Sequence, residues 1–181
     1  MRSYFTTTAL LFVVLLSAQE VVYNENFESH PIDTELTKWK GLKFQGWNKS
    51  VWKVAETEGN KFGQSTDQKK VFLIKSFELE AGATYLWSVD TKAVSEGKSS
   101  KRNHVLNVTN GNGDAMHKYG SVKINEPETD SWNSNEIKFT ILDSKTKVTL
   151  QIFRFAEGCT MAVDNYNCLL YTSDAADDTS G

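Results

Sequence analysis

The stretch "VFLIKSFELEAGATYLWSVDTKAV", residues 71–94, decides the fold. In its first half, apolar Phe77 and Leu79 alternate with polar residues. In its second half, Tyr85 and Trp87 continue the alternation after the turn sequence "AGAT". Side chains two positions apart share a face of a strand. The pattern therefore predicts a strand, a turn and a second strand, each with one buried face.

Other segments repeat this plan. The sequence "NHVLNVTNGNGDAMHKYGSVKI", residues 103–124, has two alternating runs around the turn-forming "NGNGD". Residues 136–155 form a third pair of runs, residues 21–29 read as a first strand and residues 160–166 as a last one, while 31–65 is loop-rich with short strands. Helical periodicity is hard to find between these runs. The fold class expected is all-β, an antiparallel β-sandwich of the jelly-roll kind.

The first residues have the order of a secretory signal peptide. Arg2 precedes an apolar run over residues 9–16, and the small residues Ser17 and Ala18 follow. The run is shorter than the roughly 20 residues that a membrane span needs. We therefore assign 1–19 to a signal peptide and expect a secreted or cell-surface protein, without membrane insertion. The alternative is a buried N-terminal strand.

The last residues resemble something other than a protein family. "CLLYTSDAADD", residues 168–178, is similar to the translation of a sequencing adapter. We therefore take 20–167 as the β-sandwich domain and 168–181 as a non-native tail, which would imply that the natural chain, including any catalytic domain, continues beyond Asn167. The alternative is a genuine disordered acidic tail.

Charge and cysteine content narrow the possible partners. The formal net charge is −3, and it becomes −1 without Arg2 and the three aspartates of the tail. Such a balance gives no electrostatic reason to bind nucleic acid or anionic lipid. Cys159 and Cys168 could form a disulfide in an oxidising compartment, or Cys159 could pair with a residue of the natural sequence expected to follow Asn167.

Four segments together resemble carbohydrate-binding modules of the family 4, 9 and 22 type, which have a galactose-binding-like jelly roll. These are "NENFES" at 24–29, "FELEAGATYLWSVDTKA" at 77–93, "DSWNSNEIKFTI" at 130–141 and "TMAVDNY" at 160–166. They occur in the same order as in those modules and are spread over most of the mature chain, from residue 24 to residue 166. The resemblance implies a monomeric module that binds a polysaccharide or other glycan and catalyses nothing. Fold alone does not settle function, because adhesive surface modules share this pattern.

The resemblance also implies a structural calcium ion between the first and last strands. Carried over by position, Glu28 and Asp164 would be its carboxylate ligands, with backbone carbonyls near Asn26 completing the shell. Calcium takes six to eight oxygen ligands, which two meeting chain segments can supply. The alternative is that Glu28 and Asp164 are ordinary edge or turn carboxylates.

The tryptophans are the candidates for stacking on a sugar ring. Tryptophan in a β domain is more often part of the core, and Trp87 lies in phase with the buried face. Trp39 and Trp132 match positions that pack in the resembled modules. Trp47 and Trp52, in the polar segment "FQGWNKSVWKV", and Tyr119, beyond a glycine-rich turn, are our candidates for an exposed platform. Asn107, between two inward residues of a strand, is the candidate polar contact.

Catalytic patterns are missing. His30, His104 and His117 are widely separated and show no metal-ligand spacing. The carboxylates of "NEPETD", residues 125–130, could serve a glycosidase, but a polar connection before a strand explains them better. The first hypothesis is therefore a secreted, non-catalytic glycan-binding module. The alternatives are a structural or adhesive sandwich without a sugar site and, third, a small glycan-cleaving enzyme.

Overall fold

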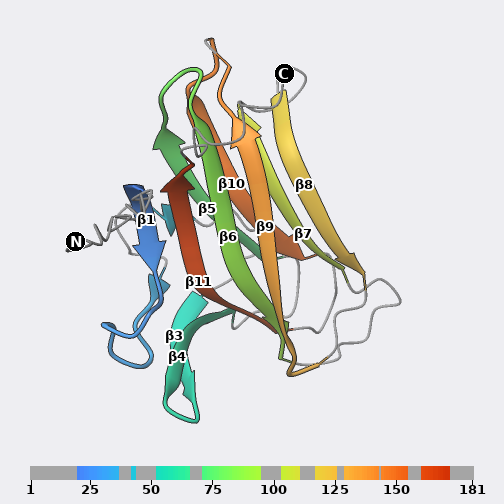
Figure 1. The fold of residues 1–181 in the computed structure, drawn as a ribbon. Coiled ribbons are helices and arrows are strands. Elements are labelled where there is room, and N and C mark those ends of the chain that lie inside the picture. The colour runs from blue at the N-terminus through green and yellow to red at the C-terminus, as the bar shows by residue number, and fades with distance from the viewer. Residues whose placement is uncertain are drawn as a thin grey trace, which may run out of the picture.

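The computed structural model describes residues 20–36, 42–43, 52–65, 71–94, 103–110, 117–125, 129–142, 144–154 and 160–171. Two sheets lie face to face across these residues, and all pairing between their strands is antiparallel (Figure 1). No α-helix occurs in the described ranges, and hence none that could span a membrane. The expected all-β, antiparallel sandwich of jelly-roll type is confirmed.

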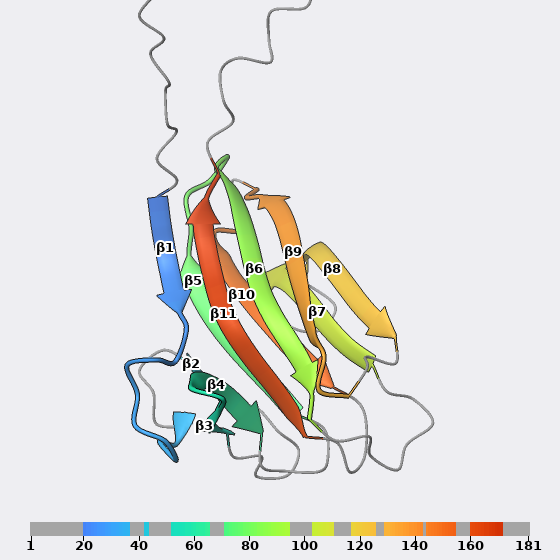
Figure 2. The ribbon, with the colours of Figure 1, turned by 60° about the horizontal axis from the view of Figure 1, so that its bottom comes forward.

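The six-stranded sheet is ordered β3-β4-β11-β6-β9, and β1 also pairs with β11. Its strands are β1 (Glu20–Glu25), β3 (Trp52–Thr57), β4 (Asn60–Ser65), β6 (Thr84–Ala93), β9 (Trp132–Thr140) and β11 (Met161–Leu170). The five-stranded sheet is ordered β2-β5-β10-β7-β8. Its strands are β2 (Leu42–Lys43), β5 (Val71–Glu78), β7 (Asn103–Asn110), β8 (His117–Asn125) and β10 (Lys147–Arg154). Figure 2 shows β1 beside β11, with the β3–β4 hairpin at one end of the sandwich.

The strands on either side of "AGAT" do not pair with each other. β5 lies in the five-stranded sheet and β6 in the six-stranded one, so residues 79–83 form an arch between layers. The connection from β9 to β10 is a second arch, of which residues 141–142 and 144–146 are described. The arches hold each other, since Leu79 N–H donates to the Thr146 carbonyl (2.9 Å) and Gly82 N–H donates to the Ile141 carbonyl (2.8 Å). The sequence predicted these strands correctly but read each pair as a hairpin.

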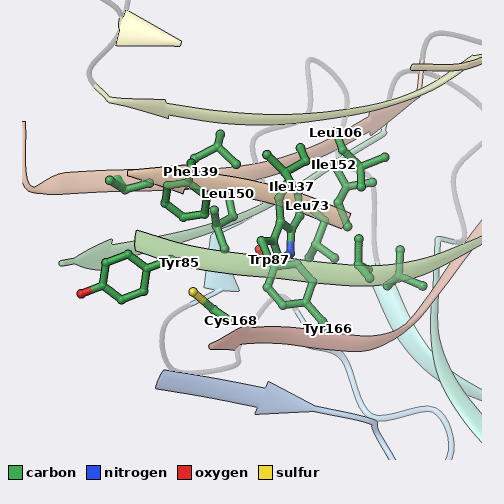
Figure 3. Packing of buried hydrophobic residues seen from close by; sticks show 14 of the residues in the cluster. Leu73, Tyr85, Trp87, Leu106, Ile137, Phe139, Leu150, Ile152, Tyr166 and Cys168 are labelled. Carbon is green, nitrogen blue, oxygen red and sulfur yellow. The ribbon is translucent and has the colours of Figure 1, made fainter. Parts of the chain in front are cut away.

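The core is built from the inward side chains of both sheets (Figure 3). On β6, Tyr85, Trp87 and Val89 are buried as their alternation predicts. The Trp87 ring lies 5.5 Å from the Tyr166 ring of β11, centroid to centroid. Leu73 and Leu150 come from the opposite sheet, and both are fully buried. Side chains from the inner faces of the two sheets interdigitate, which explains why buried and exposed residues alternate along most strands.

The last strand continues past the boundary expected at Asn167. β11 runs to Leu170, and its Cys168 is fully buried between Tyr23 of β1 and Trp87 of β6 in strand register. Cys168 is a free thiol, and burial raises its pKa to about 12. Cys159 lies outside the described residues.

The two long sides of the sandwich close in different ways. At one side, Lys75 Nζ of β5 lies 4.4 Å from the Tyr23 ring centroid of β1, and Tyr23 packs edge-on against Phe77 at 5.7 Å. At the other side, β8 approaches β9 so closely that a Cβ on Gly120 would lie 2.5 Å from Ile137 Cγ2. Gly120 is therefore required by packing.

Replacing this glycine tests the packing. Gly120→Ala should destabilise the fold by about 1–3 kcal/mol, because the added methyl group overpacks a site next to a buried isoleucine. Urea unfolding would measure the change, with Lys123→Ala, an exposed position of the same strand, as control. An unchanged unfolding midpoint for Gly120→Ala would contradict the close approach.

Candidate functional site

The two described members of the predicted aromatic platform, Trp52 and Tyr119, do not form an exposed stacking surface. Trp52 has an exposed fraction of 0% and belongs to the core, so its assignment as an exposed sugar platform is wrong. The reason is local: Trp52 and Val54 are buried, and they alternate with partly exposed Lys53 and Ala55 on β3. That short alternation was visible in the sequence and could have indicated burial. Trp47 lies outside the described residues, as does Trp39, and the role of Trp47 stays a prediction.

Tyr119 is only partly exposed. Its hydroxyl donates to the Lys145 carbonyl at 2.8 Å, and its ring packs edge-on against His117 at 4.6 Å. The ring also lies 6.0 Å from buried Phe139. These contacts hold Tyr119 against the core, at the edge of the sandwich, rather than as a free stacking surface.

Asn107 lies on the outer face of the five-stranded sheet. Its neighbours on β7, Leu106 and Val108, are buried, and Asn107 is partly exposed. Strand register places Gln151 of β10 on one side of Asn107 and Ser121 of β8 on the other. The adjoining row carries three hydroxyls. We call this surface the polar strip, comprising Ser76, Asn107, Thr109, Ser121, Thr149 and Gln151.

The polar strip is short of hydrogen-bond partners. Ser76 Oγ and Thr149 Oγ1 share a bond of 3.2 Å. Among the described side chains, however, Asn107 Oδ1 and Thr109 Oγ1 are buried without a partner. A buried polar atom in that condition costs about 1–3 kcal/mol, and such groups usually find protein, water or ligand partners. Because Thr109 is 0% exposed and Asn107 Oδ1 is covered, a hydroxyl-rich ligand would meet the other polar groups of the strip, which are exposed or partly exposed: Ser76, Ser121, Thr149 and Gln151.

The outer face of the other sheet carries a hollow of about 650 Å³. Carboxylates of β6 and β11 line it. Asp90 Oδ1 accepts a hydrogen bond from Ser134 Oγ (2.6 Å), and Asp90 Oδ2 accepts one from Asn165 Nδ2 (2.8 Å). Asp164 Oδ2 accepts one from Asn60 Nδ2 at 3.1 Å. Amides and a hydroxyl thus fix the orientation of both carboxylates.

Trp132 lines the same hollow. It was predicted to pack inside, but its exposed fraction is 38%. The reason is its position at the start of β9, in phase with outward Ser134 and Glu136 rather than with inward Asn135 and Ile137. The alternation in "WNSNEIKF" indicates this outward direction, whereas the match to positions that pack in the resembled modules indicated burial. Trp132 was therefore not predicted as a surface residue.

The residues proposed for calcium lie close to the hollow. Glu28 Oε1 accepts a bond from Lys61 N–H (3.0 Å), and Lys61 Nζ donates to the Glu28 carbonyl (3.2 Å). Asn26 Oδ1 accepts from Glu28 N–H at 3.3 Å, so this amide caps its own turn. The described residues contain no group of three or more His, Cys, Asp or Glu side chains that could hold a metal ion. The pair Glu28 and Asp164 supplies oxygen donors of the kind calcium prefers, currently engaged by N–H groups.

Asp164 sits in an unfavourable electrostatic environment. Burial raises the pKa of Asp164, and the negative charges of Asp90 and Glu28 raise it further, against the hydrogen bonds from Asn60 and Asn165. A cation near Asp164 would relieve this repulsion.

Known structures share this fold. The CBM22-1 xylan-binding domain from Paenibacillus barcinonensis has a TM-score of 0.62 and 14% identity, covering 87% of this chain and 98% of that one. The C-terminal family 22 carbohydrate-binding module of a Clostridium thermocellum protein has a TM-score of 0.62 and 10% identity, covering 84% and 96%.

A longer structure, the CBM22-1 and GH10 modules of Clostridium thermocellum xylanase 10B complexed with xylohexaose, has a TM-score of 0.62 and 13% identity. The match covers 87% of this chain but spans only 30% of that chain. No family model and no curated protein matches the sequence. At these identities, the likeness establishes the jelly-roll fold.

The raised pKa of Asp164 has a consequence for stability. A carboxyl whose pKa is raised in the folded state binds its proton more tightly there, so its contribution to stability falls as pH rises above the ordinary value of 3.8. In metal-free buffer, the stability of Asp164→Asn relative to the wild type should therefore be greater at pH 7 than at pH 3. Urea unfolding at the two pH values measures this difference, and a pH-independent difference would contradict it.

Proposed function

We propose that the chain is a non-catalytic module that binds a glycan on the polar strip. It would be secreted or displayed at the cell surface and act as a monomer. The observation that carries the proposal is the row of Gln151, Asn107 and Ser121, which are adjacent in register on an outer sheet face and are each at least partly exposed. The fold likeness supports it, because similar structures are described as xylan-binding or complexed with xylohexaose.

The strip suits a sugar chain for chemical reasons. Its amides and hydroxyls can both donate and accept hydrogen bonds, as sugar hydroxyls can. Asn107 and Gln151 are adjacent in register, and Ser121 continues the row to the edge strand. A row of polar side chains that crosses several strands can contact several sugar units of an extended ligand. Binding would need no covalent step, and the described part of this surface presents no pair of carboxylates for hydrolysis.

Substitutions in the strip test the proposal. Asn107→Ala and Gln151→Ala should each weaken binding to a neutral β-1,4-xylan by about tenfold, because each removes hydrogen bonds to the ligand. Affinity electrophoresis or calorimetry with the isolated 181-residue chain would measure the change. Glu136→Ala, exposed on the opposite sheet, is the control and should bind as the wild type does.

Other outcomes distinguish the alternatives. Equal binding by the wild type and both strip variants would reject the strip as the contact surface. If the wild type binds no polysaccharide of a broad neutral panel, the adhesive or structural module becomes the better reading. Release of reducing sugar by the purified chain would contradict a non-catalytic function.

We also propose that Glu28 and Asp164 hold a calcium ion that stabilises the fold. The support is the mutual repulsion of Asp164, Asp90 and Glu28, which a divalent cation would relieve. Calcium should raise the melting temperature of the wild type relative to chelator, because ligand binding to the folded state stabilises it. Asp164→Asn should lose most of that increase. Identical melting temperatures for the wild type with calcium and with chelator would remove the ion from the proposal.

A further inference from the structure

The hollow on the six-stranded sheet has the size of a ligand site. Its volume of about 650 Å³ falls within the range of roughly 300–1,000 Å³ typical of small-molecule sites. It opens on the outer face of β4, β6, β9 and β11, whereas the polar strip lies on the outer face of the other sheet. The two surfaces are therefore on opposite sides of the sandwich.

An aromatic surface is held in place at this hollow. Trp132 is 38% exposed, and its ring meets Phe62 edge-on at 5.6 Å between centroids. Lys92 Nζ lies 4.9 Å from the Trp132 ring centroid and 5.0 Å from that of Phe62. Phe62 and Lys92 are themselves buried. The indole is thus supported from behind and keeps part of its surface free without needing to reorganise, which favours binding.

Hydrogen-bonding groups converge beside this ring. Asp90 and Asp164 are oriented by Ser134, Asn165 and Asn60 through neutral amide and hydroxyl donors. An ionised carboxylate can accept about four hydrogen bonds, so acceptor capacity remains for ligand hydroxyls. An apolar ring next to acceptors matches a pyranose, which has C–H groups on its faces and hydroxyls around its rim.

The charge of the hollow decides which sugars it accepts. Among the described residues that line it, four are acidic, Glu58, Asp90, Asp130 and Asp164, and one is basic, Lys92. Without a cation bound at Asp164, a uronate or sulfated sugar would meet like charges, which disfavours binding. We propose that this hollow is a second saccharide site, which takes an uncharged pyranose unit stacked on Trp132 and hydrogen-bonded to Asp90 and Asp164.

The proposal stands apart from binding on the polar strip, since its residues come from the opposite face. If both sites bind, one module contacts two sugar chains or two segments of one chain. Two weak sites acting together raise the overall affinity for a dense polysaccharide well beyond that of either site.

A titration followed by amide chemical shifts tests the inference. The titration is run with chelator, so that no calcium bridges the ligand to Asp164. The probe is cellohexaose, which is uncharged, and oligogalacturonate of similar length is its charged counterpart. With cellohexaose, resonances around Trp132, Asp90 and Asn165 should shift. Trp132→Ala should weaken the affinity that these shifts report by about tenfold, and Trp132→Phe should weaken it by less. Ile32→Ala, which truncates a side chain that is 53% exposed elsewhere, should change nothing.

The outcomes of this titration distinguish the second site from the proposed function of the polar strip. Shifts confined to the polar strip and unaffected by Trp132→Ala would overturn the second site and leave the strip intact. Shifts at the hollow that persist in Asn107→Ala and Gln151→Ala would support the second site, whatever happens at the strip. Equal binding of oligogalacturonate at the hollow would overturn the assignment to an uncharged sugar. Trp132→Phe keeps an aromatic ring against Phe62, so it provides a reading even if the alanine variant unfolds.

Discussion

Trp87 packs between the two sheets, and the placement of the outer surfaces follows from that burial. It is fully buried against Tyr166, and it fixes which side of β6 faces inward. Asp90 and Lys92, an odd number of residues away, must then face outward on that strand. Backbone pairing carries this choice to β9 and β11. A change of phase on β6 would therefore turn the residues of the hollow into the core.

The two arches fix the second layer relative to the first. One arch connects β5 to β6 and the other connects β9 to β10, and each therefore passes from one sheet to the other. Because the backbones of the two arches are hydrogen-bonded to each other, the sheets are joined at one end. A layer of polar groups lies inside the sandwich as well. His104 Nδ1 of the five-stranded sheet is 3.2 Å from Thr91 Oγ1 of the six-stranded one, and both residues are fully buried. A directional bond across the interior favours one lateral alignment of the sheets over others.

Much of the fold was predictable because alternation is a local property. The strands around Tyr85, Leu106 and Leu150 appear in the sequence where the structure has them. Their partners were not predictable, since "AGAT" can close a hairpin or begin an arch. The difference depends on distant residues such as Thr146, which bonds to Leu79 N–H.

The candidate sites were predicted less well, and for a physical reason. Trp52 and Trp132 are the same residue type, but one is 0% exposed and the other 38%. The two tryptophans differ in whether their position in the strand points toward the core or away from it. The polar surroundings of Trp52 had suggested that it is exposed, and the match of Trp132 to packing positions had suggested that it is buried. Asn107 was placed correctly on an outer face because its buried neighbours in β7 define the phase directly.

The pairing of β11 has a consequence for biosynthesis. This strand lies between β6 on one side and both β4 and β1 on the other, so it completes the sheet from its middle. A nascent chain emerging from the ribosome would hold β1 and the β3–β4 hairpin without their neighbour until β11 itself had been translated. Contacts between such distant segments form slowly. Val21 and Val22 on β1 stay exposed even in the finished fold, so the unfinished edge would be vulnerable to aggregation before release.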